Sequence, residues 1–185
     1  MVQVKVMHLD QLKTKNNIVI IGTLFLRKKK KRQKMIIGID PGLDGGIAII
    51  SGKHIELLET IPTMTKGGFI KRQVDGQKLA DILRPFSDGI CYLEGVSSRP
   101  RQGVASVFSF GDTYGCIRGV LGALNIPTYT VTPTVWKKSL IISSKEDSLK
   151  ASSELFDGVK FKKKDHNIAE ALLIAYYGQK ERENG

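Results

Sequence analysis

The chain has 185 residues, of which 41% are hydrophobic and 25% are charged. This length suits one domain of ordinary size, and this composition excludes a wholly disordered or collagen-like chain. The net charge of +11 is concentrated at the N-terminus, where residues 1–34 carry ten of the 29 basic side chains and one of the 18 acidic ones. The remaining 19 basic and 17 acidic side chains give residues 35–185 a net charge of only +2.

The basic N-terminal segment contains an apolar run, IVIIGTLFL at 18–26, followed by RKKKKRQK at 27–34. The apolar run is far shorter than the roughly 20 residues that cross a bilayer, and no small-residue cleavage site marks a secretory signal. We expect residues 1–34 to be an extension without packed structure. It could act as a cellular address, tether nucleic acid through its charge, or be translated from an upstream start codon before Met35.

Residues 35–185 predict alternating strands and helices. Apolar runs with β-branched residues indicate strands, and apolar residues three and four apart indicate helices. The segment 62–76, which is basic and contains paired glycines, is predicted to be a long loop. The expected strands are 35–40, 47–50, 54–61, 89–96 and 127–131, and the expected helices are 77–86, 104–124, 134–140, 145–156 and 167–177.

This order of elements predicts an α/β fold with a five-stranded mixed sheet flanked by helices. Three strands joined by short turns form an antiparallel meander, and the last two strands join the sheet in parallel through right-handed crossovers. The two cysteines, Cys91 and Cys116, have no further candidate partners. We therefore expect reduced thiols and an intracellular protein.

Acidic residues stand at the ends of three predicted elements. Asp40 closes the apolar strand IIGID, Glu94 closes ICYLE, and Asp165 and Glu170 begin an apolar helix. Hard carboxylate oxygens arranged in this way are typical of a Mg²⁺ or Mn²⁺ site, and two such ions can hold the attacking and leaving oxygens of a phosphodiester. Two of these acids also have a simpler interpretation. Asp40 could be a turn residue and Asp165 a helix cap, whereas a lone acid such as Glu94 is more often functional or ion-paired.

The motifs GIDPGLDGGIAII, CYLEGV and DHNIAEALLIAYYG, with TVTPTVWKK and SKEDSLKASSELF between the last two, resemble those of the RuvC-type Holliday-junction resolvases. The similarity is to the phage and plastid branch in particular, and it covers residues 35–185. It implies a ribonuclease H-like nuclease domain and a homodimer that nicks four-way DNA junctions with two Mg²⁺ ions per site, which Mn²⁺ can replace. The expected location is the bacterial or phage-host cytoplasm, an organelle or the nucleus.

The resemblance also implies the site residues. Asp40 is similar to the first-strand acid of the family, Glu94 to the acid of the fourth strand, and Asp165 and Glu170 to the C-terminal acids. Many bacterial resolvases space the last two ligands three residues apart, whereas here Asn167 stands three before Glu170. His166 is four residues before Glu170, on the same helical face, and Asp165 is five before. We expect Asp165 to reach the metal from the segment before the helix, with His166 as the alternative ligand.

Basic residues are expected to contact phosphates, which positions a duplex without reading its sequence. For any single lysine taken alone, a solvated surface charge is the simpler interpretation. Arg99 and Arg101 follow Glu94 closely, so their loop is a candidate for entering the centre of a junction. The expected DNA-binding residues are Arg99, Arg101, Lys137, Lys138, Lys145 and Lys164.

Glycines recur within the predicted helix 104–124, at Gly111, Gly115, Gly119 and Gly122. Because glycine weakens a helix by roughly 1 kcal/mol relative to alanine, this spacing suggests that another backbone lies close to that face. The close partner is either the sheet beneath or the same helix of a second subunit. A two-fold dimer would present two matched active sites to a symmetric substrate.

Three other functions are compatible with parts of the sequence. A sugar kinase or actin-like ATPase also begins with a strand, an aspartate and a Gly-rich turn, but such proteins need two related domains and a second phosphate loop. A non-catalytic nucleic-acid-binding protein of the same fold gains nothing from carboxylates aimed at phosphates. A nuclease of this fold acting on RNA–DNA hybrids or branched replication intermediates is compatible with every motif.

Overall fold

The computed structural model describes residues 34–65, 72–95, 97 and 103–184. Residues 33–185 form one compact unit. Of the predicted extension 1–34, all but Lys34 lies outside the described residues, as do Arg99 and Arg101. No helix in the described part of the chain is long and apolar enough to span a membrane.

A five-stranded sheet forms the centre of the fold, in the order β3-β2-β1-β6-β7. Its strands are β1 (Ile36–Asp40), β2 (Gly46–Ser51), β3 (His54–Thr60), β6 (Ile90–Glu94) and β7 (Thr128–Val131). The first three strands pair antiparallel, whereas β6 pairs parallel with both β1 and β7. The predicted mixed sheet is confirmed, and β1 with its terminal Asp40 is the middle strand.

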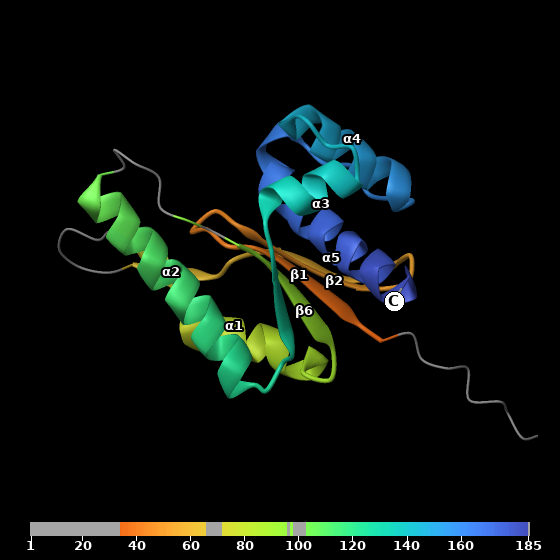
Figure 1. The fold of residues 1–185 in the computed structure, drawn as a ribbon. Coiled ribbons are helices and arrows are strands. Elements are labelled where there is room, and N and C mark those ends of the chain that lie inside the picture. Colours follow the sequence, from red (N-terminus) through yellow and green to blue (C-terminus); the bar gives the residue numbers. More distant parts are fainter. Residues whose placement is uncertain (1–33, 66–71, 96, 98–102, 185) are drawn as a thin grey trace, which may run out of the picture. The chain divides into compact units, whose positions relative to one another are not determined.

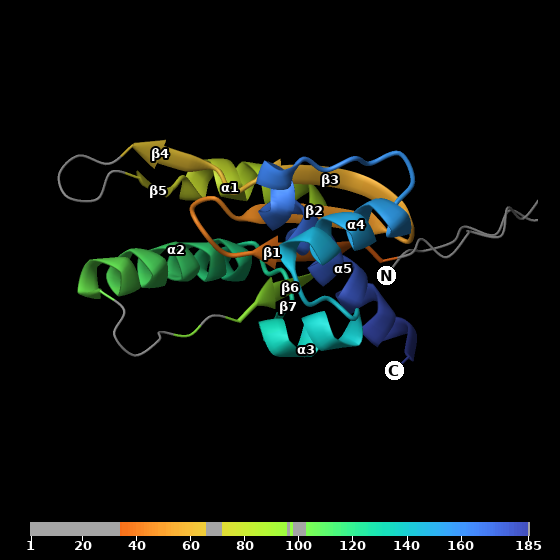
Figure 2. The same cartoon turned by 90° about the horizontal axis from the view of Figure 1, so that it is seen from above.

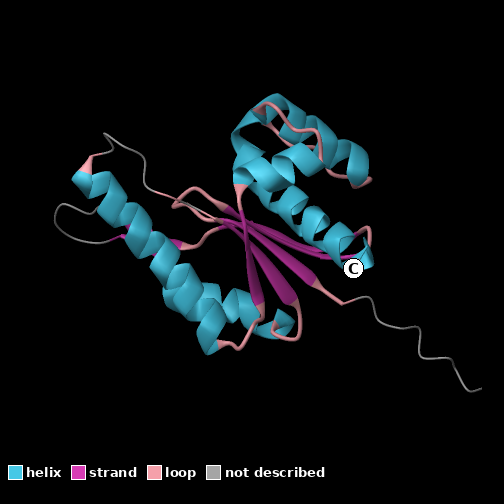
Figure 3. Ribbon diagram, in the orientation of Figure 1, coloured by secondary structure: helices cyan, strands magenta, loops and turns pink. Residues whose placement is uncertain are grey.

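Helices cover both faces of the sheet (Figures 1 and 3). One face carries α1 (Gly76–Leu83) and α2 (Val104–Ala123), and the other carries α5 (His166–Asn184) with α3 (Pro133–Ser139) and α4 (Lys145–Leu155). Short 3₁₀ turns follow α1 at Arg84–Phe86 and precede α5 at Lys163–Asp165. Alternate residues of the central strands enter two separate cores, so that Ile37 and Ile39 pack toward α1 and α2 while Ile36 packs toward α5.

The prediction of a long loop at 62–76 was wrong in part, because this segment contains a small antiparallel hairpin. Strand β4 (Thr63–Thr65) pairs with β5 (Arg72–Val74), and Asp75 N donates to Pro62 O at 2.9 Å to close it. The buried Val74 anchors the hairpin to the core beneath α1 and α2. The charges and glycines between the strands concealed this short β pattern.

Helix α5 is longer than predicted because Gly178 does not end it. The ring of Tyr92 occupies the space that a Cβ at position 178 would need. Gly178 is therefore a packing glycine inside the helix, and the helix continues to Asn184. The same close approach occurs at Gly38 of β1, where a Cβ would collide with the backbone of Ala171 and Ala175 in α5.

Substitution of Gly38 by alanine should therefore destabilise the protein. The added methyl group has no flexible neighbour to displace, and overpacking of this kind costs about 1–3 kcal/mol. Chemical denaturation should show a free energy of unfolding lower by about 1–3 kcal/mol. Gly42→Ala is the matched control, because its Cβ would meet nothing closer than 3.6 Å. Equal stability of the two variants would contradict the close packing of α5 on β1.

Candidate active site

Two acids lie side by side at the carboxyl ends of neighbouring strands. Ile39 of β1 is in register with Leu93 of β6, so the next residues, Asp40 and Glu94, end their strands beside each other. Both side chains are partly buried. The sequence predicted this placement, because parallel strands bring their carboxyl ends to the same edge of a sheet.

Glu170 reaches the same region from the first turns of α5. The start of α5 is held against the sheet at Gly46, where a Cβ would lie 2.7 Å from Asn167 O and from Ile168 Cα. Gly46 pairs with Asp40 across β1 and β2, so this contact sets the start of α5 beside the end of β1. Glu170 is 8% exposed, the lowest exposure among the predicted site acids.

The three acids affect one another electrostatically. Burial, followed by the negative charges of Glu94 and Glu170, raises the pKa of Asp40 from 3.8 to about 7. Burial also raises the pKa of Glu94, a rise that Glu170 reinforces and the hydrogen bond from Trp136 opposes. Such perturbed carboxyl groups gathered at one place are characteristic of functional sites.

Lys137 places a positive charge among these acids. Its Nζ lies 3.0 Å from Glu170 Oε1, and it lowers the pKa of both Asp40 and Glu94. The same ammonium group lies 5.0 Å from the centre of the Trp136 ring. The sequence analysis predicted that Lys137 binds DNA. In this structure Lys137 neutralises part of the negative charge of the three acids.

Two buried side chains that the sequence analysis missed orient the acids. Trp136 Nε1 donates to Glu94 Oε1 at 2.9 Å, and Ser148 Oγ donates to Glu170 Oε1 at 3.1 Å. Both residues are fully buried, so each donor is fixed by packing. Serines at 148 and 152, one helical turn apart on α4, were a signal of a small polar face, and Ser152 Oγ indeed donates to Ala169 O at 3.0 Å.

Asp165 and His166 adopt different roles at the start of α5. Asp165 ends the 3₁₀ turn, as predicted for the segment before the helix, and its Oδ2 accepts from Lys162 N at 2.9 Å. His166 Nε2 lies 3.0 Å from Lys145 Nζ. Because lysine has no acceptor, this contact makes Nε2 the acceptor nitrogen of the imidazole. Lys145 in turn lowers the pKa of Asp40, which links His166 to the acidic group.

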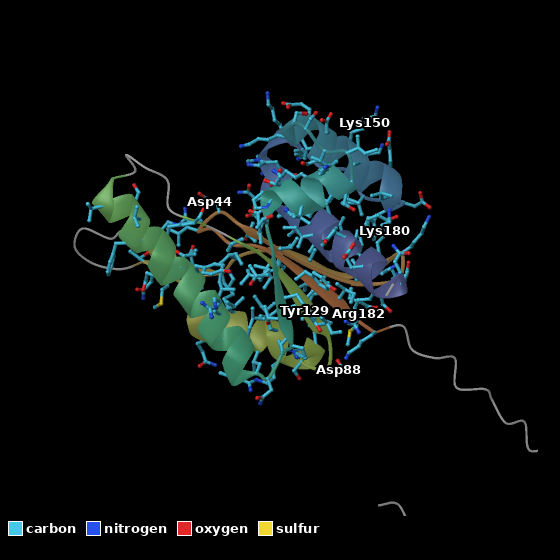
Figure 4. All side chains as sticks on the ribbon, viewed as in Figure 1. Asp44, Asp88, Tyr129, Lys150, Lys180 and Arg182 are labelled. Atoms are coloured by element: carbon cyan, nitrogen blue, oxygen red, sulfur yellow. The ribbon has the colours of Figure 1, made fainter. Side chains whose placement is uncertain are left out.

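The remaining predicted DNA contacts are spread around the site. Lys138 on α3, Lys145 at the start of α4 and Lys164 in the 3₁₀ turn are exposed. Near the start of α5, Asn167 Nδ2 donates to Asp44 O at 2.6 Å, and Arg72 binds Asp44 Oδ1 at 2.9 Å. These contacts tie the turn between β1 and β2, marked by Asp44 in Figure 4, to α5 and to the hairpin.

The donor set suits a hard divalent cation, since three carboxyl groups converge and the charge of Glu170 helps to raise the pKa of both Asp40 and Glu94. Their arrangement is not that of a closed ligand cluster. Among the described residues, no group of three or more His, Cys, Asp or Glu side chains could hold a metal ion as it stands. Glu170 is instead paired with Lys137, and Glu94 with Trp136.

Comparison of the fold with solved structures found clear similarity. The complex of T. thermophilus RuvC with a Holliday-junction substrate matches with a TM-score of 0.65 at 18% identity, covering 82% of this chain and 96% of that one. The chain has the RuvC-like ribonuclease H fold. Another Thermus thermophilus RuvC structure matches with a TM-score of 0.53 at 16% identity, covering 81% and 96%.

A more distant likeness is to the yeast mitochondrial Holliday-junction resolvase Ydc2, with a TM-score of 0.45 at 16% identity over 83% of this chain and 81% of that one. No family model and no curated protein matches the sequence. The predicted fold class is thus confirmed by the structure and by the RuvC matches.

The raised pKa of Asp40 predicts a dependence of stability on pH. The folded state holds the Asp40 proton to about pH 7 and the unfolded state releases it near pH 3.8, so stability falls as pH rises through this window. One pKa unit corresponds to about 1.4 kcal/mol. As the pH rises from 5 to 8, the free energy of unfolding of Asp40→Asn should therefore increase by about 2–3 kcal/mol relative to that of the unmodified protein.

Urea unfolding without divalent ions, at pH 5 and at pH 8, measures this difference. The control is Asp88→Asn, which changes an exposed carboxyl group between α1 and β6. If the free energy of unfolding of Asp40→Asn and of Asp88→Asn depends on pH as that of the unmodified protein does, the pKa of Asp40 is not raised in the folded state.

Proposed function

We propose that the chain is a structure-selective endonuclease that resolves four-way DNA junctions by hydrolysing phosphodiesters with divalent metal ions. The observation that carries this proposal is the convergence of Asp40, Glu94 and Glu170, where burial and the charges of the other two acids raise the pKa of Asp40 to about 7. The RuvC-like fold supports it, because a matching RuvC structure contains a Holliday-junction substrate.

The acids of this chain would hold the metal ions. Asp40, Glu94 and Glu170 would supply carboxylate oxygens, and Asp165 would complete the set from the 3₁₀ turn. When bound, Mg²⁺ polarises a phosphodiester and lowers the pKa of the attacking water. Trp136 and Ser148 would hold Glu94 and Glu170 in fixed orientations, as second contacts to metal-binding groups commonly do.

Lysines around the acids would bind phosphate oxygens. Lys137 is already paired with Glu170, so we propose that it exchanges this carboxylate for a DNA phosphate when a cation joins the acids. Lys138, Lys145 and Lys164 are exposed near the same elements and would position the backbone without reading bases. Arg99 and Arg101 remain predicted contacts from the loop after β6.

Asp40→Asn and Glu94→Gln should each abolish junction cleavage and leave junction binding equal or tighter. Both changes remove negative charge from the metal ligands and no phosphate contact. A synthetic four-way junction and a linear duplex of the same sequence, with and without Mg²⁺, provide the assay. Glu59→Gln, on the exposed side of β3, is the control. Cleavage at normal rates by both site variants would refute the proposal. Activity on the linear duplex alone would refute its substrate.

Asp165→Asn should reduce cleavage far more than His166→Ala. A neutral imidazole is a poor ligand for Mg²⁺, whereas each anionic oxygen strengthens the site. The side-chain oxygen that accepts from Lys162 N is retained in Asp165→Asn, so the free energy of unfolding should change little. Cleavage rates measured well below the melting temperature of each variant test this difference. A normal rate for Asp165→Asn with an inactive His166→Ala would assign the ligand to His166.

We further propose that α2 is the homodimer interface. Among the described residues, nothing lies within 4 Å of a Cβ placed at Gly111, Gly115 or Gly119, so the sheet is not the close neighbour of this face. Phe108, on the same face, is 63% exposed. A second copy of α2 would cover Phe108 and use the close approach that the glycines allow.

Gly115→Leu should convert the dimer to a monomer without lowering its stability. The leucine meets no intramolecular neighbour and favours the helix by nearly 1 kcal/mol over glycine. Sedimentation velocity over a range of protein concentrations measures the association. Glu154→Leu, an exposed helical substitution on α4, is the control. A Gly115→Leu protein that associates as the unmodified chain does would exclude this face.

A further inference from the structure

The outer edge of β7 is unusual for an exposed strand. Thr128, Tyr129 and Thr130 are all exposed, and β7 lies at the end of the sheet order. Its residues, TYTV, include no charged side chain and no proline. Natural edge strands usually carry such residues, because they prevent other chains from pairing with the free backbone groups.

The hydrogen-bonding pattern shows which backbone groups are directed outward. Cys91 N donates to Pro127 O at 2.8 Å, and Gly95 N donates to Val131 O at 2.6 Å. Alternate residues of a strand face the same neighbour, so Pro127, Tyr129 and Val131 face β6. The N–H and C=O groups of Thr128 and Thr130 therefore point away from β6, and no strand of the described chain pairs with them.

A cavity of about 550 Å³ adjoins this edge. It is lined by four consecutive residues, 129–132, whereas a cavity over one face of a strand would contact alternate residues. The cavity thus opens along the edge of the strand. Val135 of α3, which is 50% exposed, forms one wall.

Aromatic rings line the interior of this cavity, and charges of opposite sign line part of its border. Tyr129 stacks on Tyr92 with 5.4 Å between ring centres, and Tyr177 meets Tyr92 edge-on at 6.2 Å. Glu181 and Arg182 of α5 complete the lining, and Figure 4 shows Tyr129 and Arg182 at the same end of the fold. One acid and one base leave this site without the positive charge that a phosphate backbone requires.

From these features we propose that β7 and its cavity form a docking site for an extended peptide of a partner protein. The peptide would add a sixth strand to the sheet by pairing with Thr128 and Thr130, and would place one apolar or aromatic side chain in the tyrosine-lined cavity. Glu181 and Arg182 would bind polar groups of the peptide on either side of this apolar or aromatic residue. Main-chain bonds provide affinity and side-chain cavities provide specificity in this mode of recognition. The site is separate from the acids, so it does not depend on the proposed nuclease activity.

Two substitutions remove different parts of this site. Thr130→Pro deletes an outward N–H and leaves the bonds between β6 and β7 intact. Val135→Asp introduces a charge into the cavity wall without changing the backbone. Thr134→Asp, at an exposed position of the same helix that does not line the cavity, is the matched control. Unfolding curves establish that each variant is folded.

The probe is a phage-displayed library of random linear heptapeptides, selected on the full-length protein and counter-selected on Thr130→Pro. We expect selected peptides that share an apolar residue, lose at least tenfold in affinity for Thr130→Pro and Val135→Asp, and bind Thr134→Asp normally. They should also slow hydrogen exchange at the amides of Thr128 and Thr130. A failure to enrich any peptide, or peptides that bind all variants equally, would overturn the proposal. Self-association that Thr130→Pro abolishes would replace the peptide with a second copy of the chain.

Discussion

Repulsion among three carboxyl groups is the constraint on which the candidate site depends. Asp40, Glu94 and Glu170 come from different elements, and burial together with the charges of Glu94 and Glu170 raises the pKa of Asp40 to about 7. A protein gains no stability from such an arrangement, because each unpaired, desolvated charge costs free energy. Lys137 offsets part of this cost by its contact with Glu170. The arrangement is understandable if the acids serve a cation.

The packing of α5 against the centre of the sheet maintains this arrangement. Gly38 and Gly46 allow the backbone of α5 to approach β1 and β2 more closely than any side chain would permit. Glu170 and the first turns of α5 are thereby fixed relative to Asp40. Trp136 and Ser148, donating from α3 and α4, then fix the orientation of two of the acids. Helices α3 and α4 thus contribute to the site although they supply none of its acids.

The sequence was sufficient to predict the sheet and two of its acids, because both follow from local patterns. Apolar runs ending in Asp40 and Glu94 indicated strands, and parallel pairing brings such ends together. The hairpin at 63–74 was missed because three-residue strands are too short for an alternating pattern to be recognised. The donor to Glu94 could not be predicted either, because Trp136 is 42 residues away in sequence and only tertiary packing brings it there. The position of Lys137 among the acids could not be predicted either, since the sequence around a lysine does not show whether it binds a phosphate or an acid of the same chain.

The raised pKa of Asp40 can be measured directly. Titration of the side-chain carboxyl carbon by ¹³C nuclear magnetic resonance, first without divalent ions and then with saturating Mg²⁺, follows this one group. We expect a titration midpoint near pH 7 without metal, in agreement with the raised pKa of Asp40. We expect this pKa to fall strongly when Mg²⁺ is added. A midpoint near the ordinary value of 3.8 in both conditions would contradict the claim that these acids form a strained, cation-binding group.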